Sequence, residues 1–219
     1  MIKKLVIYGV GGFGCEVAWL IENINRKNIE WDVLGFIDDV EIDMCNKTIY
    51  NLPFLGGKEW FDINKDEIYI ICAIGNSKAR RKIYSHLERL DNVKFATLVD
   101  PSVLLADTST IGEGSIICCG SRIMVNAKLG KGVVLLTGSA IGHDAELSDY
   151  CTLFTNVMVS GSVKIGENTE IGSGAFILQM KTVSKDVVIA PLSSVLTDIV
   201  DSGTYAGNPA RRIRLPNKT

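Results

Sequence analysis

The sequence of 219 residues predicts two structural parts: an α/β domain with a truncated, Rossmann-like parallel sheet over residues 1–98, and an all-β parallel β-helix over residues 99–200. Two observations support this prediction. Apolar strand patterns alternate with helical patterns in the first part, and an aliphatic residue recurs at every sixth position in the second. Residues 201–219 are expected to form a C-terminal tail.

The order of elements in the first part is typical of a parallel sheet. Apolar patterns predict strands at 3–9, 31–39, 67–76 and 93–101, and helices at 15–27 and 77–90. Because strands alternate with helices, the sheet is expected to be parallel. The stretch "AIGN" (73–76) ends a strand, so its backbone should face the crevice where open α/β sheets bind their ligands.

Glycines directly after the first strand form a phosphate-binding fingerprint. Gly9, Gly11 and Gly14 satisfy G-x-G-x-x-G at the start of a predicted helix, which would place backbone N–H groups around a phosphate. Asp38 lies at the end of the next strand, where an acid can accept a hydrogen bond from a ribose hydroxyl. The fingerprint favours a nucleoside diphosphate over a plain turn, and it leaves NAD and a sugar nucleotide both open.

The second part is a repeat of six residues. Counting by sixes from Val99 to Val195 meets an aliphatic residue at all seventeen positions, and Asp201 ends the series. This period fits neither a helix nor a series of hairpins. It indicates a hexapeptide β-helix, in which short parallel strands form flat faces and the aliphatic side chain points inward. With three hexads in each triangular coil, the repeat predicts about five coils without a projecting loop.

Composition excludes several classes of function. A net charge of −2 without a clustered basic face argues against nucleic-acid binding. No apolar stretch is long enough to predict a membrane span, and the apolar start resembles a strand more than a signal peptide. Six cysteines without a signal sequence suggest reduced thiols in the cytoplasm. No metal site is expected, because no cluster of histidines and cysteines is present.

His143 is the main candidate for a catalytic residue. It follows the inward Ile141 by two positions, so it should point outward from a corner of the β-helix together with Asp144. A buried histidine is therefore disfavoured, and a zinc site would need imidazoles that the second part lacks. A general base remains, because an imidazole exchanges protons near neutral pH and an adjacent carboxylate fixes its tautomer.

Motifs along nearly the whole chain resemble those of a known family. They are "YGVGGFG", "FIDD", "AIGNSKARRKI", the hexads, "IGHDAELSDY", "GSVKIGENTEIGSGAF" and "YAGNPARRI". The sequence resembles the bacterial sugar acyltransferases of the sialic-acid O-acetyltransferase type, which include N-acetyltransferases acting on UDP-linked 4-amino sugars. The resemblance implies a homotrimer of left-handed β-helices in surface-glycan biosynthesis. Acetyl-CoA would lie between neighbouring helices, and the nucleotide sugar on the N-terminal domain.

The resemblance also implies roles for individual residues. His143 matches the general base and Asp144 the adjacent acid. The residues expected to bind the sugar nucleotide are Gly9, Gly11, Gly12, Phe13, Asp38, Asp39, Gly75 and Asn76. Those expected to bind acyl-CoA are Thr152, Gly161, Ser173, Pro191 and Arg211.

The chain departs from its relatives at three positions. Thr152 stands where relatives often have a second histidine near the thioester carbonyl, Phe13 where histidine is common, and Leu136 where some have asparagine near the reacting amine. Cys151 is interpreted as a packing residue rather than a nucleophile. Arg80 and Arg81 are interpreted mainly as surface charges.

The function predicted on these grounds is acetyl-CoA-dependent N-acetylation of a nucleotide-linked, UDP-type amino sugar. Three alternatives remain. The same base would serve O-acetylation of a sugar hydroxyl, and the missing second histidine is compatible with a non-catalytic scaffold that binds sugar nucleotides. The glycine fingerprint alone would also fit an NAD-dependent enzyme, which would leave the β-helix without a role.

Overall fold

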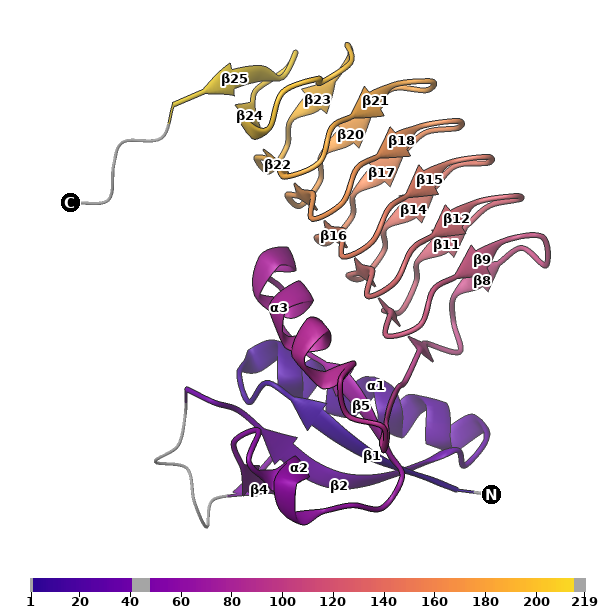
Figure 1. Cartoon of the computed structure of the whole chain (residues 1–219). Coiled ribbons are helices and arrows are strands. Elements are labelled where there is room, and N and C mark those ends of the chain that lie inside the picture. The colour runs from indigo at the N-terminus through magenta and orange to yellow at the C-terminus, as the bar shows by residue number, and fades with distance from the viewer. Residues whose placement is uncertain (1, 41–47, 215–219) are drawn as a thin grey trace.

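The computed structural model describes residues 2–40 and 48–214 and shows an α/β domain followed by a triangular β-helical prism (Figure 1). The α/β domain contains β1 (Lys3–Tyr8), α1 (Gly12–Lys27), β2 (Trp31–Ile37), β3 (Thr48–Ile49), β4 (Leu52–Gly56), α2 (Trp60–Ile63), β5 (Ile68–Cys72), α3 (Ser77–Leu87) and β6 (Val93–Phe95). The sheet order is β3-β4-β2-β1-β5-β6. All its pairs are parallel except β3 with β4, so the predicted parallel sheet is confirmed.

Some elements differ from the sequence-based expectation. The short elements β3, β4 and α2 were not expected, because two to five residues show too little periodicity to predict. Helix α1 begins at Gly12, three residues earlier than expected, and no side chain caps its first turn. The expected strand at 93–101 is divided in two: β6 pairs with β5, and β7 (Leu98–Val99) pairs with the prism strand β10 (Ile116–Ile117).

Three parallel sheets form the faces of the prism. Face 1 contains β7, β10, β13 (Val134–Leu135), β16 (Thr152–Leu153), β19 (Glu170–Ile171) and β22 (Val187–Ile189). Face 2 contains β8 (Leu104–Leu105), β11 (Arg122–Ile123), β14 (Ala140–Ile141), β17 (Met158–Val159), β20 (Phe176–Ile177) and β23 (Ser194–Val195). Face 3 contains β9 (Thr110–Ile111), β12 (Lys128–Leu129), β15 (Glu146–Leu147), β18 (Lys164–Ile165) and β21 (Thr182–Val183).

The register of these sheets confirms the hexad repeat. Ile117 lies opposite Leu135 and Leu135 opposite Leu153, so paired residues are three hexads apart. The aliphatic residues of the repeat fill the interior and are buried from the second coil onward. Burying such a side chain contributes about 1.5–3 kcal/mol. Beyond the repeat, β24 (Gly203–Ala206) extends face 1 beside β22, and β25 (Arg211–Ile213) pairs with β24 in antiparallel orientation.

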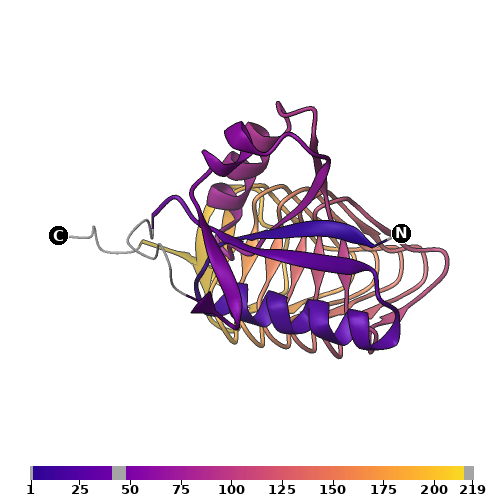
Figure 2. The same cartoon turned by 90° about the horizontal axis from the view of Figure 1, so that it is seen from below.

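The outward side chains give each face a different character. On face 1, Leu98, Ile116 and Val134 are buried against the apolar surface of the α/β domain. Face 2 exposes Leu104, Arg122 and Met158, and Phe176 next to Met158 is partly exposed. Face 3 is charged, and Lys128 lies 3.2 Å from Glu146 there. The α/β domain therefore covers face 1 and leaves the apolar residues of face 2 exposed. Figure 2 shows this domain in front of the prism.

Helix α3 lies along the corner between faces 3 and 1 and donates hydrogen bonds to three of the turns there. The Tyr84 hydroxyl donates to the Gly114 carbonyl at 2.8 Å, Nε of Arg80 to Gly132 at 2.9 Å, and Oγ of Ser77 to Asn168 at 3.0 Å. Side chains from two turns of α3 thus contact turns of the prism spread over three coil spacings, and these contacts hold the α/β domain on the prism.

Candidate active site

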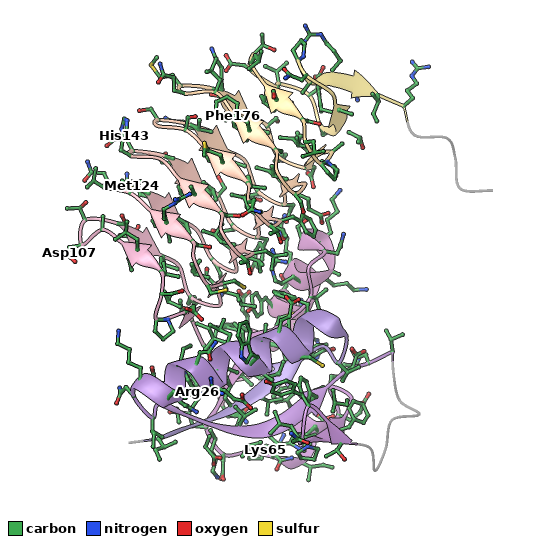
Figure 3. The ribbon with its side chains drawn as sticks, turned by 180° about the vertical axis from the view of Figure 1, so that it is seen from behind. Arg26, Lys65, Asp107, Met124, His143 and Phe176 are labelled. Carbon is green, nitrogen blue, oxygen red and sulfur yellow. The ribbon has the colours of Figure 1, made fainter. Side chains whose placement is uncertain are left out.

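His143 lies at the corner between faces 2 and 3, in the turn that joins β14 to β15. Figure 3 shows it on the same edge of the prism as Asp107 and Met124. Its side chain is 63% exposed, so the expectation that it points outward is confirmed. Asp144 has a φ of 58°, the left-handed conformation that a short polar residue tolerates at a tight turn.

A hydrogen-bonded chain of three residues orients the imidazole. Nδ1 of His143 lies 2.8 Å from Oδ2 of Asp144, and Nδ2 of Asn126 in the preceding coil donates to Oδ1 of Asp144 at 2.9 Å. These two hydrogen bonds, that of His143 first, lower the pKa of Asp144 below its ordinary value. With Nδ1–H donating to the carboxylate, the neutral ring has its free lone pair on Nε2.

Gly161 lies one coil after His143, directly beneath the imidazole. A Cβ atom at Gly161 would lie only 2.5 Å from Nε2 of His143, so any other residue there would displace the ring from this position. The His143 carbonyl accepts from the N–H of Ser162 at 2.8 Å, which ties the two turns together. Gly161, expected at the acyl-CoA site, is thus a neighbour of the candidate base.

A cavity of about 780 Å³ opens at the carboxyl ends of β1 and β5. Gly11, Asp38 and Asp39 line it, as do Ile74 and five residues of α3, among them Ala79, Lys82 and His86. Helix α1 begins beside this cavity with an uncapped first turn. Gly14 brings α1 close to β1, because a Cβ there would collide with the Gly9 carbonyl oxygen. Gly11 therefore lies at the cavity beside an uncapped helix start, which is a kind of site at which phosphates bind in other proteins.

The two acids at the end of β2 have partners inside the domain. Asp38 accepts from the N–H of Val10 at 3.2 Å and from that of Val40 at 2.9 Å, which closes the strand end around the cavity. Asp39 accepts from the N–H of Lys58 at 2.9 Å. Burial raises the pKa of Tyr8, which also lines the cavity, and the nearby Asp39 carboxylate raises it further.

Thr152 does not lie with the other candidate acyl-CoA residues. It points outward from face 1 and is fully buried beneath the α/β domain, where its hydroxyl contacts Arg80 and Gly75 at 2.8 Å each. The expectation that Thr152 contacts acyl-CoA is therefore wrong for this structure, because no ligand can reach a side chain without exposed surface.

Arg80 is fully buried, so the interpretation of Arg80 as a surface charge is also wrong. The helical spacing of the sequence could have predicted this burial. Arg80 lies on one face of α3 together with Ser77, Tyr84 and Leu87, and all four are buried. Arg81, on the other side, is partly exposed and lies 3.4 Å from Glu167, as a surface charge should.

Phe13 and Leu136 have packing roles. Both lie against the apolar cluster formed where the α/β sheet and α1 meet face 1 of the prism. Phe13 does not line the cavity described above, so the structure does not bring it together with Asp38 and Gly11. Gly75 and Asn76 are at the end of β5, where Asn76 caps α3 by accepting from the N–H of Ala79 at 2.9 Å.

The remaining acyl-CoA candidates lie at the other edge of face 2. Ser173 and Pro191 are exposed at the corner between faces 1 and 2, one coil apart. Arg211 is exposed on β25 at the C-terminal end of the prism, where its guanidinium donates to the Ala210 carbonyl. His143 and Gly161 are at the opposite corner, so face 2 separates the two groups within one chain.

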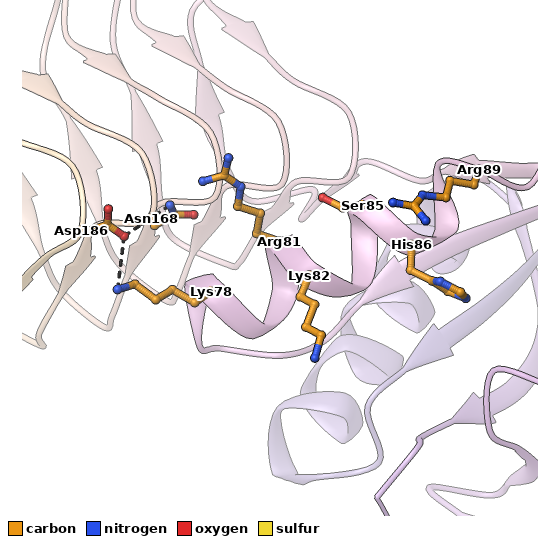
Figure 4. Close-up of a pocket in the computed structure, with 8 residues that line it drawn as sticks. All are labelled: Lys78, Arg81, Lys82, Ser85, His86, Arg89, Asn168 and Asp186. Carbon is orange, nitrogen blue, oxygen red and sulfur yellow. Dashed lines mark hydrogen bonds and ion pairs between the residues drawn. The ribbon is translucent and has the colours of Figure 1, made fainter.

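A second hollow of about 640 Å³ lies on the outer side of α3. It is lined by Lys78, Arg81, Lys82, Ser85, His86, Arg89, Asn168 and Asp186 (Figure 4). Lys78 lies 3.3 Å from Asp186, and Lys82 and His86 line both this hollow and the cavity. Lys82 therefore places a positive charge on the α3 side of the cavity.

Two further properties concern only residues 2–40 and 48–214. No group of three or more histidines, cysteines or acids there is arranged to hold a metal ion. Among the same residues, no helix combines the length and apolar character that a bilayer crossing requires.

Comparisons with known proteins agree with both parts of the chain. Residues 4–87 match the PglD N-terminal domain. The chain is 28% identical to the GDP-perosamine N-acetyltransferase of Escherichia coli O157:H7, over 95% of each protein. It is 32% identical to the UDP-N-acetylbacillosamine N-acetyltransferase of Bacillus subtilis, over 53% of this chain and 51% of that one.

Solved structures extend this similarity to the complete fold. The acetyltransferase domain of PglB from Neisseria gonorrhoeae superimposes with a TM-score of 0.86 at 26% identity, covering 96% of this chain and 100% of that one. The same domain has also been solved in complex with acetyl coenzyme A. The first part of the chain therefore matches a PglD-type N-terminal domain, and the whole chain is similar to bacterial acetyl-CoA-dependent sugar acyltransferases that join such a domain to a left-handed β-helix.

Proposed function

We propose that the chain transfers the acetyl group of acetyl-CoA to the amine of a nucleotide-linked amino sugar, with His143 as the general base. The main observation is the 2.8 Å contact between His143 and Asp144, which leaves Nε2 free at an open corner. The named activities of the E. coli and B. subtilis relatives support an amino-sugar acceptor.

The proposed reaction is a direct transfer. Nε2 of His143 takes a proton from the sugar amine while the amine nitrogen attacks the thioester carbonyl. Backbone N–H groups of the next coil, near Gly161, stabilise the oxyanion, and the intermediate collapses to the amide and the CoA thiolate. The imidazolium then returns its proton to the thiolate. Asp144 stabilises the imidazolium and holds its tautomer throughout.

We further propose that the active unit is a homotrimer packed around face 2. The cavity lies with the α/β domain over face 1, whereas His143 lies at the corner between faces 2 and 3. A sugar bound in the cavity therefore faces away from His143 of its own chain. In a cyclic trimer, the His143 corner of one subunit meets the corner with Ser173 and Pro191 of the next.

The nucleotide is proposed to lie in the 780 Å³ cavity, with its diphosphate near the first turn of α1 and its base near Asp38 and Asp39. We propose a uridine nucleotide, in agreement with the B. subtilis relative, whereas the E. coli relative is named for a guanosine nucleotide. Calorimetry with UDP, GDP and NAD distinguishes the three, and binding of NAD alone would refute a sugar-nucleotide site.

The acetyl-transfer assay tests the function as a whole. Purified protein is mixed with acetyl-CoA and a UDP- or GDP-linked 4-amino sugar, and released CoA thiol is measured. We expect release with the amino sugar and none with its N-acetylated form. His143→Ala should lose most of the rate, whereas Asp107→Ala, on the same edge of the prism, should keep it (Figure 3). Full activity of His143→Ala would disprove the assigned base.

The same assay separates the alternatives. Release of CoA with a hydroxy sugar nucleotide, and none with an amino one, would identify an O-acetyltransferase. Nucleotide binding without CoA release on any acceptor would identify a non-catalytic scaffold.

A further inference from the structure

Arg80 joins the end of β5 to the prism through neutral acceptors. Its Nη1 donates to the carbonyls of Ile74 at 2.7 Å and Gly75 at 3.1 Å. On the prism side, Nε and Nη2 donate to carbonyls of Gly132 at 2.9 Å and Tyr150 at 3.0 Å. Within residues 2–40 and 48–214 no carboxylate forms an ion pair with this guanidinium. A buried charge is usually paired with an opposite charge, so the presence of an arginine at this position needs a functional explanation.

Thr152 completes the arrangement from the prism. Its Oγ1 accepts from Nη2 of Arg80 at 2.8 Å and donates to the Gly75 carbonyl at 2.8 Å. The Gly75 carbonyl is therefore held by two donors from different elements, and its orientation is fixed.

The fixed carbonyls determine where the following N–H groups point. In a planar trans peptide, the C=O and the next N–H point in opposite directions. Since the carbonyls of Ile74 and Gly75 face Arg80, the N–H groups of Gly75 and Asn76 face away from it. Neither N–H meets an acceptor among the described residues. A Cβ at Gly75 would meet no atom within 4 Å, so the space beside this peptide is open.

These two donors follow directly after Ile74, at the strand end beside the cavity. The side chain of Ile74 lines the cavity at the carboxyl end of β5. In the first turn of α3, Glu170 accepts from the Ser77 N–H at 2.8 Å and Asn76 from the Ala79 N–H, so that only the Lys78 N–H lacks an acceptor among the described residues. The N–H groups of Gly75 and Asn76 are therefore two donors left between the end of β5 and the start of α3.

We propose that Arg80 is a positioning residue for the diphosphate of the nucleotide: it fixes the peptides from Ile74 to Asn76 so that the Gly75 and Asn76 N–H groups donate to phosphate oxygens. The inference rests on the proposed nucleotide acceptor. The buried guanidinium also adds positive potential behind these donors, which favours a diphosphate over a neutral group.

The test compares a nucleoside diphosphate with the same nucleoside without phosphate. Isothermal titration calorimetry with UDP and uridine, and with GDP and guanosine, gives the ratio of the two affinities. Arg80→Met should lower the affinity for the diphosphate about tenfold or more, and that for the nucleoside much less, because it releases two charge-stabilised contacts. Arg80→Lys should restore part of the ratio.

The matched control is Tyr84→Phe, which removes another buried contact between α3 and the prism, the one to Gly114. It should lower the thermal midpoint and leave the affinity ratio unchanged. If Arg80→Met lowered the affinities for the diphosphate and for the nucleoside by the same factor, Arg80 would have only a structural role. That result would overturn the proposal.

A milder variant keeps the proposal testable if Arg80→Met does not fold. Thr152→Val removes one donor to the Gly75 carbonyl and should shift the ratio in the same direction by a smaller factor; an unchanged ratio would overturn the proposal. Wild-type protein that binds neither UDP nor GDP would instead refute the proposed acceptor class, which is a separate outcome.

Discussion

Nδ1 of His143 and Oδ2 of Asp144 lie 2.8 Å apart although the two residues are adjacent in the chain. The left-handed conformation of Asp144 turns its carboxylate back toward the preceding ring, and Asn126 holds the other oxygen. The pair therefore depends on one turn and on one contact with the preceding coil.

We predict that Asp144→Asn lowers kcat by roughly 100-fold. An amide can donate to Nδ1, which would leave the proton on Nε2 and remove the base. Asn126→Ala should lower kcat less, because Asp144 keeps its contact with the ring. Steady-state kinetics with an amino sugar nucleotide measures both values, and an unchanged kcat in Asp144→Asn would contradict the tautomer argument.

Gly161→Ala should lower kcat about tenfold and leave nucleotide affinity unchanged, because its methyl group would displace the imidazole above it. Gly161 does not have a positive φ, so the change acts through the collision and not through backbone strain. The double variant His143→Ala with Gly161→Ala tests this: the methyl group should cost nothing once the ring is gone. A further tenfold loss in the double variant would place Gly161 in an independent role.

The hexads predicted the prism and the outward corner of His143, because both follow from a local period of six. The fingerprint glycines likewise predicted that a cavity lies at the carboxyl end of β1. Arg80 and Thr152 were misplaced for a common reason: their contact joins residues 72 positions apart and depends on how α3 fits the corner of the prism. The 93–101 segment was divided for the same reason, since β6 and β7 pair with different sheets.

Alkaline pH should destabilise the protein through its buried thiols. Burial raises the pKa of Cys72, Cys118 and Cys151 to about 12, from an ordinary value of 9.0. Between these values the unfolded chain loses protons that the folded chain keeps, so the free energy of unfolding falls as pH rises. The contribution of the three thiols to the free energy of unfolding is fully present below pH 9. Urea unfolding at increasing pH measures the slope.

Cys151→Ala should make that slope shallower and leave acetyl transfer intact, because a protonated, buried thiol is a poor nucleophile. An inactive Cys151→Ala protein that still folds and binds nucleotide would reopen the assignment of Cys151 as a packing residue.

Met158→Glu should dissociate the proposed trimer. Met158 is 49% exposed on the apolar face 2, and a charge there would have to be buried between subunits. Thr182→Glu, an outward position on the charged face 3, is the matched control and should leave the assembly intact. Light scattering measures the mass, and an assembled Met158→Glu protein would show that face 2 is not the interface.

Mixed trimers should recover activity that neither parent variant has. His143→Ala lacks the base, and Asp38→Ala should disturb the nucleotide cavity, which Asp38 lines. If each active site combines the cavity of one subunit with His143 of the next, then a mixed trimer contains one intact site. Random mixing of equal amounts should restore roughly a quarter of wild-type activity. Each variant alone is the control. A mixture as inactive as its parents, after exchange of subunits is confirmed by mass, would mean that cavity and base act within one chain.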